Sequence, residues 1–204
     1  MMMIEVGAMA MSQKRDTTDK FILAAIDLMA AKGYNGVTTQ EIAEHAGFSE
    51  KTLFRHFQSK QNLLEMAFQR YHYADEMKEL FETKIQWDLQ ADLLMISRSY
   101  HDSMYRNRKL IMIATKDGGN LPGFRERTHQ HPQQLKALLV DYFTTMIQKG
   151  KMIVTDPETK ALAFIYMNYG AAMGRMNDDP MLREVTFDKL IEDEVWLFVR
   201  ALLP

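Results

Sequence analysis

The segment from Val37 to Lys60 constrains the fold of this chain more than any other stretch. Thr38 is followed three residues later by Glu41, the spacing of a capping box, in which a hydroxyl and a carboxylate each satisfy a free amide at the start of a helix. Gly47 comes where that helix should end, because glycine adopts the left-handed conformation of a helix C-terminus at least cost. Ser49 then has the position of an N-cap for a second helix. The segment therefore predicts two short helices joined by a tight turn.

The second predicted helix, Glu50 to Phe57, has one apolar and one polar face. Leu53 and Phe57 are four residues apart and form the apolar face. The polar face carries Glu50, Lys51, Thr52 and Arg55. Ser59 predicts the start of a third helix, with Lys60 at its first position. This arrangement is the helix-turn-helix plan, whose second helix fits the major groove of DNA; an ordinary corner between two helices is the alternative.

A longer run of residues around this segment matches a known pattern in order and spacing. It comprises FILAAIDLMAAKGY at residues 21–34 and then Thr38, Ile42, Ala43, Ala46, Gly47, Phe48, Ser49, Thr52, Leu53, Phe54, Arg55, His56, Phe57, Ser59, Lys60, Leu63 and Leu64. These positions cover about residues 17 to 65 without a gap and resemble the DNA-binding domain of the TetR family of bacterial transcriptional regulators. One departure is Phe54, where the family usually has Tyr, so a phenol oxygen often used on the DNA backbone is missing.

The resemblance implies how this domain would contact double-stranded DNA. It implies phosphate contacts by Thr38, Thr39, Ser49, His56 and Lys60. The best candidates for contacts to base edges are Glu50, Lys51, Thr52 and Arg55. Phe54 would lie against the backbone or a thymine methyl. The resemblance also implies a homodimer, whose approximately palindromic operator would have half-site centres about 34 Å apart, or a multiple of the helical turn.

Composition agrees with an all-α chain. The 204 residues suffice for one large or two small cores, apolar residues make up 47% of them, and only 5 are proline. Cysteine is absent, which excludes a disulfide framework and thiolate metal ligands and is compatible with the cytoplasm. No segment reaches eighteen uncharged apolar residues, so we expect no membrane span. The net charge of -2 is mild evidence against DNA binding, but Lys51, Arg55, His56 and Lys60 concentrate positive charge locally.

Three parts are expected along the chain: a disordered arm at residues 1–15, a three-helix helix-turn-helix domain at 16–62, and a helical ligand-sensing and dimerisation domain at 63–204. The first helix should begin at a cap formed by Thr17 or Thr18 and run to about Lys32. A helix from Ser59 to about Lys84 should span both cores and transmit movement between them. Further helices are expected at about 87–116 (broken near 105–107), 124–149, 157–174 and 187–203.

The second domain is expected to hold a hydrophobic or aromatic effector. The chain has 17 methionines, and methionine lines adaptable apolar sites well. Candidate lining residues are Tyr100, Met104, Met112, Phe124, Tyr142, Phe143, Met146 and Asn168. Plain filling of the core is the alternative for each of them. A buried amide such as that of Asn168 needs a partner, which a ligand, a water or another subunit would supply.

The last two helices are expected to form a dimer face, and packing within the monomer is the alternative. Gly170 and Gly174 are four apart beside alanines, so a neighbouring helix can approach closely. The final helix is apolar on most sides. The candidate interface residues are Phe164, Gly170, Ala171, Gly174, Ile191, Val195, Trp196 and Val199.

Catalytic and cofactor sites are not indicated. No nucleophile and base stand at catalytic spacing, and the glycine-rich loop at 117–123 lacks the lysine of a phosphate-binding loop. Glu126, His129 and His131 are expected to be solvated, with a metal site as the less favoured alternative. His101, together with Arg98 and Asp102, is explained as well by a polar group on the surface as by a functional site.

The favoured hypothesis is therefore a ligand-responsive DNA-binding regulator, a repressor by the family's usual habit, without cofactor, metal or enzymatic activity. Two alternatives stay open at this point. The same architecture would also serve a protein that acts mainly through a protein partner in chromosome organisation. An all-α carrier or enzyme is the less favoured alternative.

Overall fold

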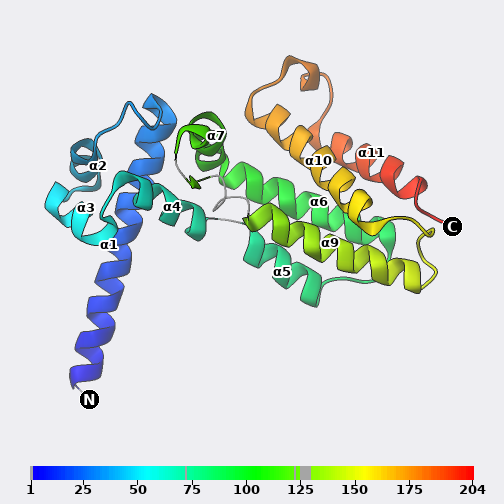
Figure 1. Cartoon of the computed structure of the whole chain (residues 1–204), viewed down its shortest axis with the longest axis horizontal. Helices are drawn as coiled ribbons and strands as arrows, with labels where there is room; N and C mark the ends of the chain where they lie inside the picture. The colour runs from blue at the N-terminus through cyan, green and yellow to red at the C-terminus, as the bar shows by residue number, and fades with distance from the viewer. Residues whose placement is uncertain (1, 72, 122, 125–129) are drawn as a thin grey trace. The chain divides into compact units, whose positions relative to one another are not determined.

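The structure of the protein is a computed structural model that describes residues 2–71, 73–121, 123–124 and 130–204. The described residues form α-helices and short 3-10 turns without a strand (Figure 1), so the fold is all-α as predicted. The chain divides into two compact units. Unit 1 comprises Met1–Tyr71 and Lys109–Thr128, and unit 2 comprises His72–Arg108 and His129–Pro204.

Unit 1 is built from the N-terminal helices and one later helix. Its elements are α1 (Met2–Lys32), α2 (Thr39–Ala46), α3 (Glu50–Phe57), α4 (Lys60–Arg70), α7 (Arg108–Asp117) and the 3-10 turn η1 (Gly118–Asn120). The core of unit 1 contains Phe21, Ile22, Leu53 and Leu64, and α7 adds Leu110 to it. The apolar spacing of α7 does not show which core the helix joins, so the prediction assigned it to the second domain with the rest of residues 63–204.

The first helix begins earlier than expected. We expected it to start at a cap formed by Thr17 or Thr18, but α1 runs unbroken from Met2. Threonine is tolerated inside a helix, and the residues before it are mostly good helix formers such as Met, Ala and Glu. The helix thus also covers the stretch predicted as a disordered arm.

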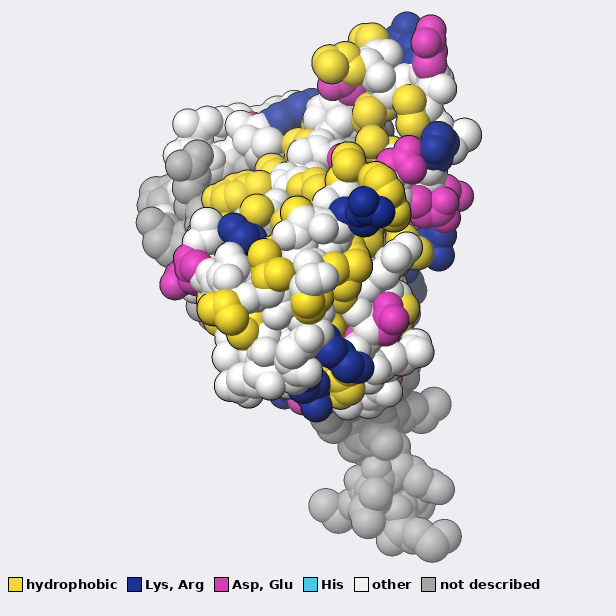
Figure 2. Space-filling view, turned by 90° about the vertical axis from the view of Figure 1, so that its right-hand side faces the viewer, with side chains coloured by type: hydrophobic (Ala, Val, Ile, Leu, Met, Phe, Trp, Pro, Cys, Tyr) yellow, Lys and Arg dark blue, Asp and Glu magenta, His cyan; other side chains and the backbone are white. Residues whose placement is uncertain are grey.

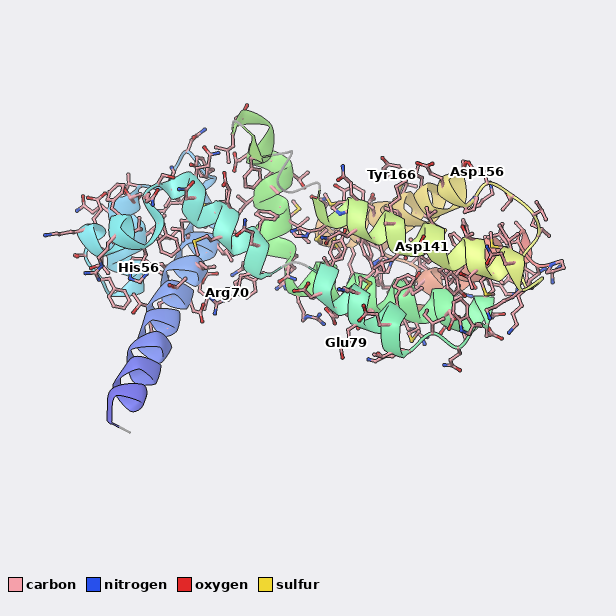
Figure 3. The ribbon with its side chains drawn as sticks, turned by 60° about the horizontal axis from the view of Figure 1, so that its bottom comes forward. His56, Arg70, Glu79, Asp141, Asp156 and Tyr166 are labelled. Carbon is pink, nitrogen blue, oxygen red and sulfur yellow. The ribbon has the colours of Figure 1, made fainter. Side chains whose placement is uncertain are left out.

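The predicted helix from Ser59 to Lys84 is wrong, because the structure contains two helices there. α4 ends at Arg70, which Figure 3 labels, and α5 spans Ala74–Thr83. The guanidinium of Arg70 contacts Asp19 Oδ1 at 2.7 Å. Tyr71 packs against the core of unit 1, whereas the Tyr73 ring meets Tyr100 in unit 2 with centroids 5.3 Å apart. The chain passes from one core to the other between these two tyrosines, and no glycine or proline marks the place.

Unit 2 is a bundle of α5, α6 (Leu89–Arg106), α9 (Gln130–Gln148), α10 (Pro157–Met176) and α11 (Phe187–Arg200), with the 3-10 turn η2 (Pro180–Leu182) before α11. The expected break near 105–107 is confirmed at Asn107. Asp156 caps α10 with Pro157 at its first position, as predicted. Pro132 lies in the first turn of α9, where its missing amide costs nothing. Among the residues that the structure describes, no helix has the length and hydropathy to cross a bilayer.

Candidate nucleic-acid interface

The helix-turn-helix is held together by the local contacts that its sequence predicts. Thr38 Oγ1 accepts a hydrogen bond from Glu41 N at 3.1 Å, and Glu41 Oε2 accepts one from Thr38 N at 2.8 Å, which confirms the capping box. Gly47 has φ of 79°, in the left-handed region. Hydrogen bonds from Lys32 and from Thr38 lower the pKa of Glu41 to about 2. The start of α2 is thus fixed by charge as well as by backbone geometry.

α3 is anchored from behind and exposed in front. Leu53 and Phe57 are buried, and Phe57 meets Phe21 edge-on with ring centroids 5.7 Å apart. The opposite side, which we call the outer face of α3, consists of Glu50, Lys51, Thr52, Phe54 and Arg55. Ser49 Oγ caps the helix by accepting from Thr52 N at 3.3 Å. Because the apolar anchors fix the rotation of α3, its outer face has a defined orientation.

The base-reading candidates on this face differ in their exposure and in whether they already have a partner within the chain. Lys51 and Arg55 are exposed and form no ion pair within the described part of the chain. The ring of Phe54 is 44% exposed. Glu50, in contrast, accepts a hydrogen bond from Thr39 Oγ1 at 2.6 Å, which braces α3 against α2. Two cations and one ring are therefore the groups most available to an incoming ligand.

The phosphate candidates are largely engaged within unit 1. Thr38 and Ser49 serve as N-caps, Thr39 binds Glu50, and His56 Nδ1 lies 3.3 Å from Thr18 Oγ1. These hydroxyls nevertheless stand at the N-termini of α2 and α3, where free amide groups and the helix dipoles favour an anion.

Lys60 makes contacts that the sequence did not suggest. Its Nζ donates to Tyr34 O at 2.8 Å and to Val37 O at 2.7 Å, and lies 4.2 Å from the centroid of the Tyr34 ring. Burial lowers the pKa of Lys60, against the opposing charges of Asp117 and Glu41. The ammonium therefore closes the turn between α1 and α2.

Asp117 also holds this turn, and sequence reasoning missed it. Tyr34 N donates to Asp117 Oδ2 at 2.9 Å, which joins the end of α7 to the entrance of the helix-turn-helix. The two residues are 83 positions apart, so no local spacing signals the contact. Within unit 1, α7 is thus linked to the DNA-binding module by both apolar packing and a hydrogen bond.

The effector candidates fall into both units. Phe124 belongs to the core of unit 1, where it meets Phe68 edge-on with centroids 5.2 Å apart, and Met112 lies on α7. The remaining candidates are buried in unit 2: Tyr100, Met104, Tyr142, Phe143, Met146 and Asn168. Tyr142 donates its hydroxyl hydrogen to Asp92 Oδ2 at 2.9 Å, and Asn168 Nδ2 donates to Phe164 O at 2.8 Å. Both polar groups therefore already have partners.

His101 is a correction to the sequence analysis. Arg98 is exposed and pairs with Glu192 at 2.6 Å, as a surface residue would, but His101 is buried with 2% of its surface exposed. The helix α6 packs against both α10 and α11, and the ring of His101 meets Phe187 at the start of α11. Glu126 and His129, of the less favoured metal site, lie outside the described residues.

Most of the predicted dimer residues serve the core of unit 2 instead. Buried within the chain are Phe164, Ala171, Ile191, Val195 and Val199. Their side chains are unavailable to a partner because the apolar stripes of α10 and α11 first cover the chain's own core. Gly170 and Trp196 are exposed, and Gly174 is half-buried.

The exposed apolar side chains of these two helices are Tyr166 and Tyr169 on α10 (Figure 3 labels Tyr166) and Trp196 and Leu197 on α11. We call these four residues the outer α10–α11 face. Figure 2 shows further hydrophobic side chains spread over the side of unit 2 that includes the C-terminus. An apolar surface of this kind is typical of a protein that associates.

Comparisons with known proteins agree with this geometry. The family model described as bacterial regulatory proteins, tetR family, matches residues 21–67. The uncharacterized HTH-type transcriptional regulator YvkB of Bacillus subtilis (strain 168) is 31% identical over 188 residues, which cover 92% of this chain and 98% of that protein.

Solved structures share the fold at lower identity. NalD, the secondary repressor of the MexAB-OprM multidrug efflux pump in Pseudomonas aeruginosa, aligns with a TM-score of 0.77 and 19% identity over 94% of this chain and 97% of that chain. The transcriptional regulator FadR from Bacillus subtilis, in complex with stearoyl-CoA, aligns with a TM-score of 0.73 and 18% identity over 88% of this chain and 96% of that chain.

Proposed function

The chain belongs to the TetR family of bacterial regulatory proteins and is a DNA-binding transcriptional regulator, and from this premise we propose that it is a homodimeric repressor released from a palindromic operator by a small hydrophobic or aromatic effector. The observation that carries the DNA-binding part is the outer face of α3. Its cations are exposed and unpaired among the described residues, while Leu53 and Phe57 anchor the helix. We place the protein in the cytoplasm, where the bacterial chromosome lies.

Each residue of this surface has a role in the proposal. Lys51 and Arg55 contact base edges, for which guanine O6 and N7 are the usual acceptors of Arg and Lys. Phe54 packs against a thymine methyl or the sugar-phosphate backbone. Thr52 and Glu50 complete the base-reading set, with Glu50 also bracing Thr39.

The phosphate contacts come from three places. Thr38, Thr39 and Ser49 lie at the N-terminal ends of α2 and α3, His56 lies in the last turn of α3, and Lys60 is the first residue of α4. An ammonium has three donors, and Lys60 uses two of them on Tyr34 O and Val37 O. Its third hydrogen is left for a phosphate, so in this proposal Lys60 both supports the surface and touches DNA.

Release by an effector requires two states of the dimer with different operator affinities. A hundredfold loss of affinity corresponds to about 2.7 kcal/mol of differential effector binding. The fold of FadR, which was solved with stearoyl-CoA, supports a hydrophobic effector as the class. Because α4 ends at Arg70, it is not the single long helix that was expected to transmit movement between the two cores. We assign this role to the chain segment that runs from α6 through Asn107 into α7.

The proposal is tested by selecting bound sequences from a random DNA pool and titrating the enriched site. We expect a palindromic site, and we expect Arg55→Ala to cost about 1 to 3 kcal/mol on it while relaxing the preference at one base position. An equal loss on random DNA would remove Arg55 from the base-reading set. Spin labels on the two α3 helices should report a changed distance when an effector releases the DNA; an unchanged distance would exclude the mechanism.

A further inference from the structure

Unit 2 contains polar atoms that are buried without a partner. Ser97 Oγ and both ring nitrogens of His101 have no hydrogen-bond partner among the residues that the structure describes, although both side chains are buried. Two other buried polar side chains, one on α6 and one on α10, contrast with them: Asp92 accepts from Gln86 N at 2.9 Å, and Asn168 donates to Phe164 O. Unpartnered buried polar groups are costly, so a pair of them calls for a function.

The two residues form one patch on α6. They are four positions apart, which places them on the same face of the helix. The ring of His101 meets the ring of Phe187 edge-on, with centroids 4.9 Å apart. The side chain of Asn168 faces the ring closely enough for hydrogen bonding to raise the pKa of His101, but the contact lacks the geometry of a full hydrogen bond, so both ring nitrogens stay unsatisfied. The patch is therefore enclosed by aromatic and amide side chains from α10 and α11.

Phe187 also lines a surface hollow. The hollow has a volume of about 170 Å³, and its lining includes Gly174, Arg175, Leu182, Phe187 and Leu190. Thr186, the N-cap of α11, makes no side-chain hydrogen bond to the helix that Phe187 begins. Phe187 thus contacts His101 and also lines the hollow, at a helix end that lacks a side-chain cap, and the guanidinium of Arg175 lies 4.4 Å from the centroid of its ring. A ligand that reaches the buried patch from the hollow would therefore have to move this ring.

The chemistry of the patch favours a ligand that carries an uncharged hydroxyl group. Burial is the main cause that lowers the pKa of His101 to about 4, so the ring is neutral at pH 7, and Arg175 lowers the pKa further. A neutral imidazole offers one donor and one acceptor, and a serine hydroxyl offers the same. The nearby rings of Tyr100 and Phe187 favour an aromatic body over an aliphatic one.

We propose that Ser97 and His101 form the polar end of an effector site that takes a small aromatic molecule with one uncharged hydroxyl, a phenol, which enters from the hollow by displacing the Phe187 ring. This inference rests on the proposed function only in that the ligand is called an effector. Binding itself is independent of DNA, so the two can fail separately.

The test uses the full-length protein without DNA and three probes of similar size: p-cresol, toluene and benzylamine. Their affinities are measured by calorimetry, and the imidazole resonances of His101 are followed by NMR. His101→Phe keeps the ring volume and removes the nitrogens, and Ser97→Ala removes the hydroxyl. Ser103→Ala is the matched control, because Ser103 is a second buried serine of α6 that lies six positions from Ser97, on another face.

We expect p-cresol to bind at least about tenfold tighter than toluene and benzylamine, and to shift the His101 resonances until saturation. His101→Phe and Ser97→Ala should each weaken p-cresol binding about tenfold and leave toluene unchanged. Ser103→Ala should match the wild type. Equal affinities for the three probes, or unmoved His101 resonances, would overturn the site; if His101→Phe does not fold, Ser97→Ala and the resonances decide. Release of the operator by p-cresol is measured separately and tests the proposed function alone.

Discussion

At the residue scale, Lys60 has a structural role in the turn before α2 and an electrostatic role towards DNA, and the two can be measured separately. Its two hydrogen bonds to carbonyl groups and its contact with the Tyr34 ring stabilise the turn before α2. We predict that Lys60→Ala lowers the free energy of unfolding by about 1 to 3 kcal/mol, because two partly buried carbonyl groups lose their donor. It should also weaken binding to all DNA sequences alike and flatten the salt dependence by about one unit. Chemical denaturation and salt titration measure these two effects independently; an unchanged denaturation midpoint would leave Lys60 with a phosphate role only.

His101 should make stability depend on pH. Its pKa is lowered to about 4 in the folded chain from an ordinary value of 6.5, so the unfolded chain binds more protons between these values. The native state is therefore favoured fully above pH 6.5 and loses stability as the pH falls toward 4, by up to about 1.4 kcal/mol per pH unit. The difference between wild type and His101→Phe, measured by denaturation at pH 7 and pH 5, isolates this contribution. Parallel pH profiles for the two proteins would show that His101 titrates normally.

Glu41 should also make the folded state more stable as the pH rises, but in a more acidic range than His101. Its folded pKa of about 2 is depressed from 4.5, so its contribution is complete above about pH 4.5 and disappears as the pH falls through 2. Glu41→Gln should lack this dependence while keeping an acceptor for Thr38 N. Thermal melts of both proteins between pH 5 and pH 2.5 check the prediction, and curves that stay parallel would contradict it.

At the scale of elements, what the sequence predicted well is local. The capping box at Thr38, the left-handed Gly47 and the Asp156 cap each depend on residues a few positions apart, so their chemistry is readable directly. The end of α4 at Arg70 was missed because it results from two tyrosines packing in different cores. Helical periodicity shows which residues are apolar, but not which core or subunit they cover.

The same limit applies to the sites. The anchored α3 with its exposed cations followed from spacing alone, because Leu53 and Phe57 set the rotation of the helix. The buried patch around His101 did not, since a histidine on a helix gives no sign of its burial until the helices opposite it are known. The engagement of Lys60 by Tyr34 O and Val37 O likewise depends on a turn more than twenty residues earlier.

The contact between α7 and the turn at Tyr34 gives an element-scale prediction. Asp117→Ala removes the acceptor of Tyr34 N, whereas Asp117→Asn keeps an oxygen in the same place. We expect Asp117→Ala to speed hydrogen exchange at Tyr34 and to weaken operator binding about five- to tenfold, the effect of losing one hydrogen bond. Asp117→Asn should stay near the wild type in both measurements. Unaltered exchange at Tyr34 in Asp117→Ala would show that the turn does not depend on α7.

At the scale of the whole molecule, the outer α10–α11 face should decide the oligomeric state. Tyr166 is 68% exposed and Leu197 62% exposed, although both belong to helices that otherwise pack well. Charges introduced into a dimer core leave buried unpaired ions, so Trp196→Glu with Leu197→Glu should yield monomers. Val154→Glu is the control, because Val154 is 90% exposed and lies before α10. Light scattering coupled to gel filtration distinguishes the outcomes, and a dimeric double variant would move the interface elsewhere.

The affinity for the operator should then depend on the spacing at which the dimer holds its two α3 helices. Two α3 helices held on one two-fold axis bind half-sites about 34 Å apart, and linking the two contacts raises affinity by about 10² to 10⁴ over one half-site. An insertion of about five base pairs between half-sites rotates one of them to the opposite side of the duplex, so wild-type affinity should fall toward the single-site value. The monomeric variant of the outer α10–α11 face should bind both operators equally and weakly, since it never engages two half-sites at once. A wild-type protein indifferent to the insertion would mean that its two DNA-binding units are not held at a fixed spacing, and would remove the basis for release by a change in that spacing.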